Sequence, residues 1–355
     1  MSGAQNQVKG QNAMTAPTIE GALRPAETPD HLPRRRELID LESWTPAELE
    51  ALVERAAFMR AALADPTRRF ETLRGLLVVT LFYENSTRTR VSFELAARRM
   101  GADVASVAAS SSSVTKGESL RDTVETLQAL GAQIIVVRSS QSGAPDVIAR
   151  HMRGAVVNAG DGWRGHPTQA LLDLFTMRRH LGALAGRRVV ILGDILHSRV
   201  ARSNLWSLTA LGAEVVLCAP PTLLAPDFAA AYTARLVPVT GERRRVSVEP
   251  RIEAALAGAD VVMALRLQRE RQQAGLLPSL REYTLRYGLT PERLALANPG
   301  ALVMHPGPMN EGIEIDSAVA HGAASLVEEQ VSNGVATRMA ALEMIGRALA
   351  TGSRP

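Results

Sequence analysis

The sequence is poor in cysteine. Its 355 residues contain one, Cys218, so the chain can form no internal disulfide framework and no metal site built from several cysteines. This is compatible with a reducing compartment. Cys218 follows the apolar run Val215-Val216-Leu217, and we interpret it as a buried structural thiol rather than a nucleophile.

Aromatic residues and long apolar runs are also scarce. Aromatic residues make up 4% of the chain and the net charge is +4, with the arginines spread along the sequence. This favours small anionic substrates over a nucleic-acid partner. The apolar runs are far shorter than the roughly 20 residues of a membrane-spanning helix, and no basic-then-apolar signal peptide opens the chain. We expect a cytoplasmic protein that binds neither nucleic acid nor membrane.

The length and the order of the patterns indicate two α/β domains. A chain of 355 residues with 46% apolar content suffices for two cores. Residues 1–36 lack periodicity and are rich in Gln, Asn, Ala, Pro and Gly, which is typical of a disordered tail. Beyond them strands alternate with helices, which predicts two doubly wound domains with mostly parallel sheets. We place these at 37–181 and 182–327, with a helix at 328–350 that packs back on the first domain.

Local signals place most of the elements. Thr45-Pro46-Ala47-Glu48 has the form of a helix start, with a Thr cap, Pro at the first position and Glu at the third. An irregular region is expected at 220–250 and a polar loop at 110–117. The predicted helices are 45–64, 86–100, 119–130, 144–152, 166–181, 200–211, 251–257 and 328–349, and the predicted strands are 76–83, 104–107, 134–138, 155–158, 189–192, 214–217, 261–264 and 301–304.

One strand-to-helix turn carries an unusual density of donors. Ser86-Thr87-Arg88-Thr89-Arg90 supplies three hydroxyls and two guanidinium groups in five consecutive residues. A helix N-terminus offers unpaired backbone N–H groups and a partial positive charge, and these donors together suit a phosphate group. The alternative is an ordinary helix cap with solvated arginines. We favour the phosphate site because so many donors coincide.

Further polar residues follow the ends of other predicted strands, where ligands bind in open α/β sheets. Arg138 ends one strand, and Arg199 follows another. His166 and Gln169 lie one turn apart at the start of a helix that Pro167 fixes. Arg266 and Gln268 alternate in the same direction beyond the strand 261–264. The rigid segment 305–308, His-Pro-Gly-Pro, follows the strand 301–304.

Several familiar motifs are missing. The strand end Val190-Ile191-Leu192-Gly193 does not continue as G-x-G-x-x-G, and the chain has no G-x-x-x-x-G-K-[ST], which argues against a dinucleotide site at that strand and against a P-loop. It also lacks G-x-S-x-G and H-E-x-x-H, the patterns of the nucleophile elbow and of a zinc protease. A site made of cations and neutral donors suits anionic substrates and a negatively charged transition state. We expect such a site to need neither a metal nor a cofactor.

Three motifs, in this order, resemble the aspartate/ornithine carbamoyltransferase family. They are 86–90 (Ser-Thr-Arg-Thr-Arg), 166–169 (His-Pro-Thr-Gln) and 305–308, and the resemblance extends from about residue 38 to 349. Lys116-Gly117-Glu118, the segment 265–271 and the Pro-Gly-Pro form of the late motif resemble the aspartate-specific branch. The ornithine branch carries a cysteine in the late motif and a Ser-Met-Gly segment, and neither occurs here.

The resemblance implies an active site in the cleft between a carbamoyl phosphate-binding domain (37–181) and an aspartate-binding domain (182–327). It implies transfer of the carbamoyl group of carbamoyl phosphate to the α-amine of L-aspartate, a step of pyrimidine biosynthesis. Its implied carbamoyl phosphate ligands are Ser86, Thr87, Arg88, Thr89, Arg138, His166, Gln169, Gly307 and Pro308, with Arg88, Thr89, Arg138 and His166 as the catalytic groups. Its implied aspartate ligands are Lys116, Arg199, Arg266 and Gln268.

The resemblance also implies a homotrimer with shared sites, in which Ser112 and Lys116 come from the neighbouring subunit, and a pairing of Glu84 with an arginine across the domain gap. A regulatory chain or a dihydroorotase-type partner stays open. So do a transcarbamylase for another amino acid and a non-catalytic, partner-binding family member. One departure is Glu311 in Asn310-Glu311-Gly312, where the bacterial pattern has arginine, which puts in doubt any rim contact made there.

Overall fold

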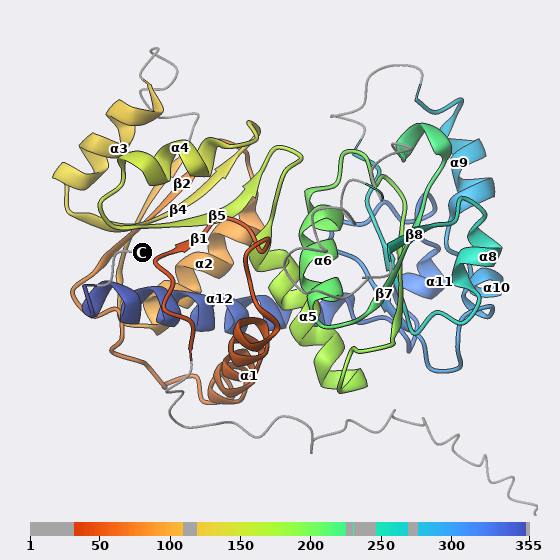
Figure 1. The fold of residues 1–355 in the computed structure, drawn as a ribbon, viewed down its shortest axis with the longest axis horizontal. Helices are drawn as coiled ribbons and strands as arrows, with labels where there is room; N and C mark the ends of the chain where they lie inside the picture. The colour runs from red at the N-terminus through yellow and green to blue at the C-terminus, as the bar shows by residue number, and fades with distance from the viewer. Residues whose placement is uncertain (1–31, 109–118, 225–229, 231–245, 269–275, 353–355) are drawn as a thin grey trace, which may run out of the picture.

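The structure, a computed structural model, describes residues 32–108, 119–224, 230, 246–268 and 276–352. Within these ranges the chain forms two five-stranded sheets, which lie side by side (Figure 1). Every strand pair in both sheets is parallel. The predicted α/β class with two parallel-sheet domains is therefore confirmed.

The first sheet has the order β1-β5-β4-β2-β3. Its strands are nearly continuous apolar runs because helices cover both faces. Successive residues of the central strand β4 alternate between two cores: Ile134 and Val136 lie in one, Ile135 and Val137 in the other. The strands are β1 (Glu37–Leu38), β2 (Leu77–Phe82), β3 (Asp103–Ala108), β4 (Ala132–Ser139) and β5 (Ala155–Asp161).

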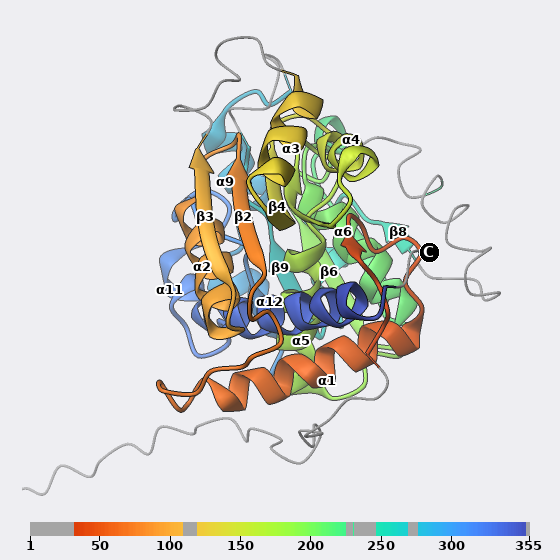
Figure 2. The same cartoon turned by 90° about the vertical axis from the view of Figure 1, so that its left-hand side faces the viewer.

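Helices α3 and α4 cover one face of this sheet, α2 and α12 lie on the side of the other face, and α1 packs against α12 on that side (Figure 1). Figure 2 shows α12 running alongside α1. The predicted capping box is present, since the Thr45 side chain accepts from the Glu48 N–H and the Glu48 side chain accepts from the Thr45 N–H. The helices are α1 (Pro46–Ala62), α2 (Thr87–Arg99), α3 (Leu120–Ala129), α4 (Ala144–His151) and α12 (Val327–Ala350).

The second sheet has the order β10-β9-β6-β7-β8. Its strands are β6 (Arg188–Leu192), β7 (Glu214–Cys218), β8 (Val246–Val248), β9 (Val261–Ala264) and β10 (Leu302–Met304). Its helices are α6 (Arg199–Ala210), α8 (Ile252–Leu256), α9 (Leu280–Tyr287), α10 (Pro291–Leu294) and α11 (Ser317–Ala320), with a 3-10 turn at Pro221–Leu223.

Helix α5 (Pro167–Leu181) lies at the junction of the two halves (Figure 1). Every residue from Pro167 to Met177 is buried, because α5 packs against α1, α12 and β5 on one side and α6 on the other. A helix that is buried all round is a core element. The first turn of α5 therefore has a fixed position relative to both sheets.

Several sequence-based expectations need correction. Residues 32–36 do not belong to a disordered tail, because Leu32 is buried and Arg35 pairs with Glu48 at 2.7 Å. The short edge strands β1 and β8 were not predicted, and β8 falls in the region expected to be irregular. The helices α9, α10 and α11 were also missed. Cys218 is fully buried as expected, and burial raises the pKa of its thiol to about 12.

Candidate active site

A cavity of about 680 Å³ lies between the two sheets, at the carboxyl ends of β2, β4, β6, β9 and β10. This edge is where open α/β sheets bind ligands. All the predicted site residues that the structure describes line this one cavity, whereas Ser112 and Lys116 lie outside the described residues. The predicted residues are Ser86, Thr87, Arg88, Thr89, Arg138, His166, Gln169, Arg199, Arg266, Gln268, Gly307 and Pro308.

The floor of the cavity is the start of α2. Ser86 is the N-cap, and its Oγ accepts from the Thr89 backbone N–H at 3.4 Å and donates to Thr89 Oγ1 at 2.9 Å. No acidic residue occupies the first turn of α2. The positive end of the helix is therefore not neutralised by its own first turn, which is the arrangement that binds a phosphate or another anion.

Arg88 joins this turn to the late loop of the other half. Its Nη2 donates to the Pro306 carbonyl at 2.8 Å. Gly307 has φ +62°, and a Cβ there would lie 2.3 Å from Arg88 Nη1. Glycine adopts this backbone angle without strain, and a side chain here would displace the Arg88 guanidinium. Burial lowers the pKa of Arg88, which remains a cation at neutral pH.

Glu84 connects the two halves at the cavity wall. Its carboxylate accepts from Arg199 Nη1 at 3.0 Å and from Arg199 Nη2 at 2.7 Å, and also accepts from Arg138 Nη2. Glu84 follows β2, and Arg199 begins α6 in the other half. The predicted pairing of Glu84 with an arginine across the domains is confirmed. Such a two-point pairing of a guanidinium with a carboxylate fixes the relative orientation of the groups.

His166 is the N-cap residue of α5, and its backbone N–H donates to Ser203 Oγ at 2.8 Å. Burial, together with the charges of Arg199, Arg138, Arg338 and Arg88, holds the pKa of His166 well below 6.5. The imidazole is therefore neutral at physiological pH. A neutral imidazole donates one hydrogen bond and accepts one.

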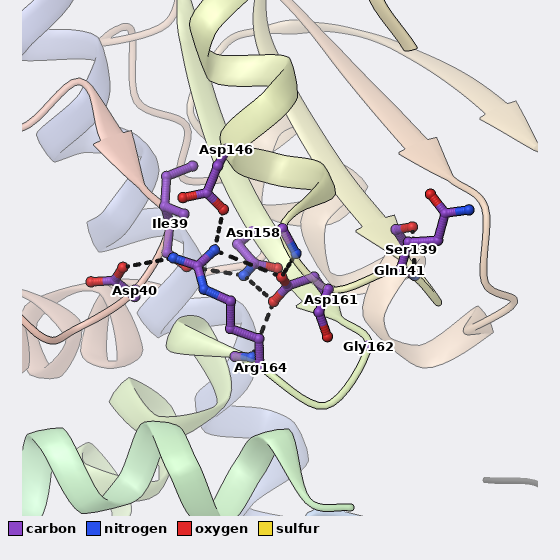
Figure 3. Close-up of polar contacts among 12 residues, drawn as sticks. Ile39, Asp40, Ser139, Gln141, Asp146, Asn158, Asp161, Gly162 and Arg164 are labelled. Atoms are coloured by element: carbon purple, nitrogen blue, oxygen red, sulfur yellow. Dashed lines mark hydrogen bonds and ion pairs between the residues drawn. The ribbon is translucent and has the colours of Figure 1, made fainter. Parts of the chain in front are cut away.

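A buried carboxylate supports the turn that leads to His166 (Figure 3). Asp161 Oδ1 accepts from the Gly165 N–H at 3.0 Å and from Asn158 Nδ2 at 2.8 Å, and Oδ2 accepts from the Gly143 N–H at 2.7 Å. Arg164 lies 3.8 Å away and also contacts Asp40 and Asp146. Burial raises the pKa of Asp161. Asp161 and Arg164 thus connect the turn 161–165 to the start of α4, and this fixes the position of the next residue, His166.

A second polar network lies beneath Gln169. Gln169 Nε2 donates to Asp173 Oδ1 at 2.9 Å, Gln330 Nε2 donates to the same oxygen at 2.7 Å, and Asn204 Nδ2 donates to Oδ2 at 2.9 Å. Gln330 Oε1 accepts from the His305 N–H at 3.0 Å. Burial raises the pKa of Asp173 to about 6. The carboxylate is thus linked to α5, α6, α12 and the late loop.

The opposite wall consists of the segment after β9. Gln268 donates its backbone N–H to Asp194 Oδ2 at 3.4 Å, and Asp194 Oδ1 contacts His197 Nδ1 at 2.8 Å. His197 packs edge-on against Trp163 of the first half, with ring centroids 4.9 Å apart. Arg266 and Gln268 line the same cavity as Arg88. Two clusters of cations therefore face one space from the two halves.

The sequence reasoning missed several residues of this region. Asn85, Ser140, Ser198 and Leu265 also line the cavity. Four further residues lie outside the lining of this cavity and support residues that line it, namely Asp161, Asp173, Gln330 and Arg338. The available signals were weak: Asp173 is one carboxylate within an apolar helix, spaced four residues from Gln169, which is the spacing of facing side chains on a helix.

The described residues were also compared with the requirements of a metal site and of a membrane-spanning helix. In the part of the chain that the structure describes, no group of three or more His, Cys, Asp or Glu side chains is arranged to hold a metal ion. Over the same described ranges, none of the helices combines the length and hydropathy required to cross a membrane.

Family models match both halves. The model described as the aspartate/ornithine carbamoyltransferase carbamoyl-P binding domain matches residues 36–179, and that of the Asp/Orn binding domain matches residues 185–345. The chain therefore belongs to the aspartate/ornithine carbamoyltransferase family. The aspartate carbamoyltransferase catalytic subunit of Chloroflexus aggregans is 60% identical over 309 residues, which cover 87% of this chain and 97% of that relative.

Solved structures give the same fold. Aspartate transcarbamoylase from Trypanosoma cruzi, in complex with carbamoyl phosphate and aspartate, has a TM-score of 0.77 at 27% identity and covers 87% of this chain and 95% of its own. Ornithine carbamoyltransferase from Thermus thermophilus has a TM-score of 0.75 at 26% identity, with 88% and 99% covered. The fold is thus shared by enzymes named for two different amino acids.

Proposed function

We propose that this chain transfers the carbamoyl group of carbamoyl phosphate to the α-amine of L-aspartate, giving N-carbamoyl-L-aspartate and phosphate, a reaction of pyrimidine biosynthesis. The single observation that carries the proposal is the one cavity in which the α2 N-terminus, four arginines and a neutral imidazole converge from both halves. The 60% identical relative named for aspartate supports the choice of acceptor.

The proposed carbamoyl phosphate site is built mainly from the first half, with Gly307 and Pro308 contributed by the late loop of the second half. Ser86, Thr87, Arg88 and Thr89 bind the phosphate through hydroxyls, a guanidinium and the helix N-terminus. Gln169, Gly307 and Pro308 contact the carbamoyl amide. Arg199, Arg266 and Gln268 bind the two carboxylates of aspartate. The proposed limits of the carbamoyl phosphate domain, the aspartate domain and the C-terminal helix are 37–181, 182–327 and 328–350.

The chemistry follows from these positions. The α-amine of aspartate attacks the carbamoyl carbon as the neutral amine, and the carbonyl oxygen becomes an oxyanion. Thr89, Arg138 and His166 donate to that oxygen, and losing one such donor typically costs about 3–4 kcal/mol of barrier. The carbon–oxygen bond to phosphate then breaks, and the leaving phosphate accepts the amine proton. Alignment of the two substrates contributes roughly 7–11 kcal/mol.

The proposed assembly is a homotrimer located in the cytoplasm, with Ser112 and Lys116 of each chain reaching the neighbour's site. Its support is a second cavity of about 480 Å³, which adjoins the first along Arg88 and lies between α2 and α12. Three apolar residues at this cavity are exposed: Val91 at 41%, Leu95 at 48% and Val331 at 47%. Exposed apolar residues grouped at one place suit a protein–protein interface.

A direct assay tests the activity. Purified protein is incubated with carbamoyl phosphate and either L-aspartate or L-ornithine, and both the carbamoylated product and released phosphate are measured. We expect product from aspartate at a rate at least 100-fold above that from ornithine. Carbamoylation of ornithine alone, or no product from either amino acid, would refute the proposal.

A further inference from the structure

The amide of Gln169 is held in one orientation. Its Nε2 donates to Asp173 Oδ1 at 2.9 Å. An ionised carboxylate only accepts hydrogen bonds, so the nitrogen, and not the oxygen, must face Asp173. Among the residues that the structure describes, none donates to Gln169 Oε1. The oxygen of Gln169 is therefore the amide atom available to a ligand in the cavity that this residue lines.

The same carboxylate also orients the late loop. Gln330 uses its Nε2 on Asp173 and its Oε1 on the His305 N–H, so both ends of its amide are committed. His305 Nδ1 in turn accepts from the Gly307 N–H at 2.8 Å. Asp173 is fully buried. Asp173 therefore fixes the orientation of the Gln169 amide directly. Through Gln330 and His305 it also fixes the position of the Gly307 backbone at the cavity.

We propose that Asp173 is a positioning residue that makes the site prefer a carbamoyl phosphate over an acyl phosphate without an amide. This inference rests on the proposed function. A fixed Gln169 oxygen accepts a hydrogen bond from the carbamoyl NH₂. An acetyl group places a methyl there, which leaves that buried oxygen without a donor, and an unmet buried acceptor weakens binding.

The test compares the dissociation constants of carbamoyl phosphate and acetyl phosphate, which share the phosphate and differ at the amide. For Asp173→Asn we expect the preference for carbamoyl phosphate to fall about 10-fold, because Gln169 is free to turn its NH₂ into the cavity. The affinity for acetyl phosphate stays within about 2-fold of the parent. A variant that retains the full preference would overturn the inference.

Thr176→Val is the matched control. Thr176 is buried on α5, donates to the Leu172 carbonyl at 2.7 Å and accepts from Asn333 Nδ2 at 3.0 Å, and it forms no hydrogen bond with Gln169 among the described residues. It should lower the melting temperature and leave the ratio of the two constants unchanged. If both variants reduced the ratio equally, the effect would be loosened packing, and the inference would fail.

The unaltered protein provides a second measurement, which needs no variant to fold. The pKa of Asp173 is about 6, and a protonated carboxyl can donate to Gln169. The charged group facing Asp173 among the described residues is Arg338 on α12, and burial together with nearby arginines holds the pKa of His166 well below 6.5. The preference should fall as the pH drops from 8 to 5 and stay flat in Asp173→Asn. A flat ratio in the parent would contradict the inference, whereas absence of any carbamoyl phosphate binding would refute the proposed function itself.

Discussion

At the scale of single residues, the site contains a buried cation, Arg138, and a histidine that remains neutral, His166. Arg138 is 9% exposed and donates to Glu84 and to the Ala159 carbonyl. His166 is neutral at physiological pH because burial, reinforced by the charges of four arginines, holds its pKa well below 6.5. Hydrogen-bond donors fixed in this way need little rearrangement when charge develops on a substrate oxygen.

The first residue-scale prediction concerns Arg138. Arg138→Ala should lower kcat with aspartate by about 10²–10³-fold, the usual effect of removing one oxyanion donor. The fold should persist, because Glu84 keeps both of its bonds to Arg199. Circular dichroism and thermal melting check the fold, with the exposed Arg74→Ala as the control. A rate within a few-fold of the parent would remove Arg138 from the mechanism.

At the scale of elements, the strand–turn–helix at 82–94 contacts the late loop through Arg88, whose Nη2 donates to the Pro306 carbonyl at 2.8 Å. Gly307→Ala should weaken carbamoyl phosphate binding at least 10-fold, since its Cβ would lie 2.3 Å from Arg88 Nη1. Gly312→Ala is the matched control: its φ is +78°, so it carries similar backbone strain of about 1–2 kcal/mol, but nothing lies within 4 Å of its Cβ. Equal losses in both variants, measured as KM and melting temperature, would show that strain alone is responsible.

Elements with strong local signals were predictable from sequence, and those defined by tertiary pairing were not. The Thr45 capping box marks the start of α1 within four consecutive residues. By contrast, Glu37–Leu38 is a strand only because residues of β5 supply its hydrogen-bond partners. The same holds for Val246–Val248 beside β7. Two or three residues carry too short a pattern to distinguish a strand from a loop.

The residues of the candidate site also fall into two groups, those that the sequence predicts and those that it does not. The donors at 86–90 were evident because a strand, a turn and a helix follow each other in the chain. The pairing of Glu84 with both Arg138 and Arg199 joins residues 54 and 115 positions apart. No local sequence pattern specifies a contact between residues so far apart in the chain. The contact of Glu84 with Arg199 was expected only from the family resemblance. Asp173 was missed because a single acid in an apolar helix does not indicate its partners.

At the scale of the whole molecule, the proposed trimer makes a prediction about complementation. Lys116→Ala and Arg138→Ala chains should each have little activity alone. Mixed trimers should regain a measurable fraction, because some sites would receive an intact Lys116 from one chain and an intact Arg138 from another. Recovery is measured after co-refolding, with one variant carrying a charged tag so that the hybrids can be separated by ion exchange.

The control mixes Arg138→Ala with His166→Ala. Both residues lie in the cavity of their own chain, so each hybrid site lacks one of them and no recovery is expected. Failure of the Lys116 and Arg138 pair to recover, with mixed trimers present, would mean that each chain completes its own site.

The burial of the Cys218 thiol makes the chain suitable for labelling at introduced cysteines. A chain whose sole sulfhydryl sits at 0% exposure with its ionisation suppressed reacts slowly with maleimides and nitroxide reagents. Pairs of cysteines introduced on the outer surfaces of the two halves could then carry fluorophores or spin labels without a cysteine-free background. Their separation, followed as substrates are added, would report directly whether the halves move toward each other during turnover.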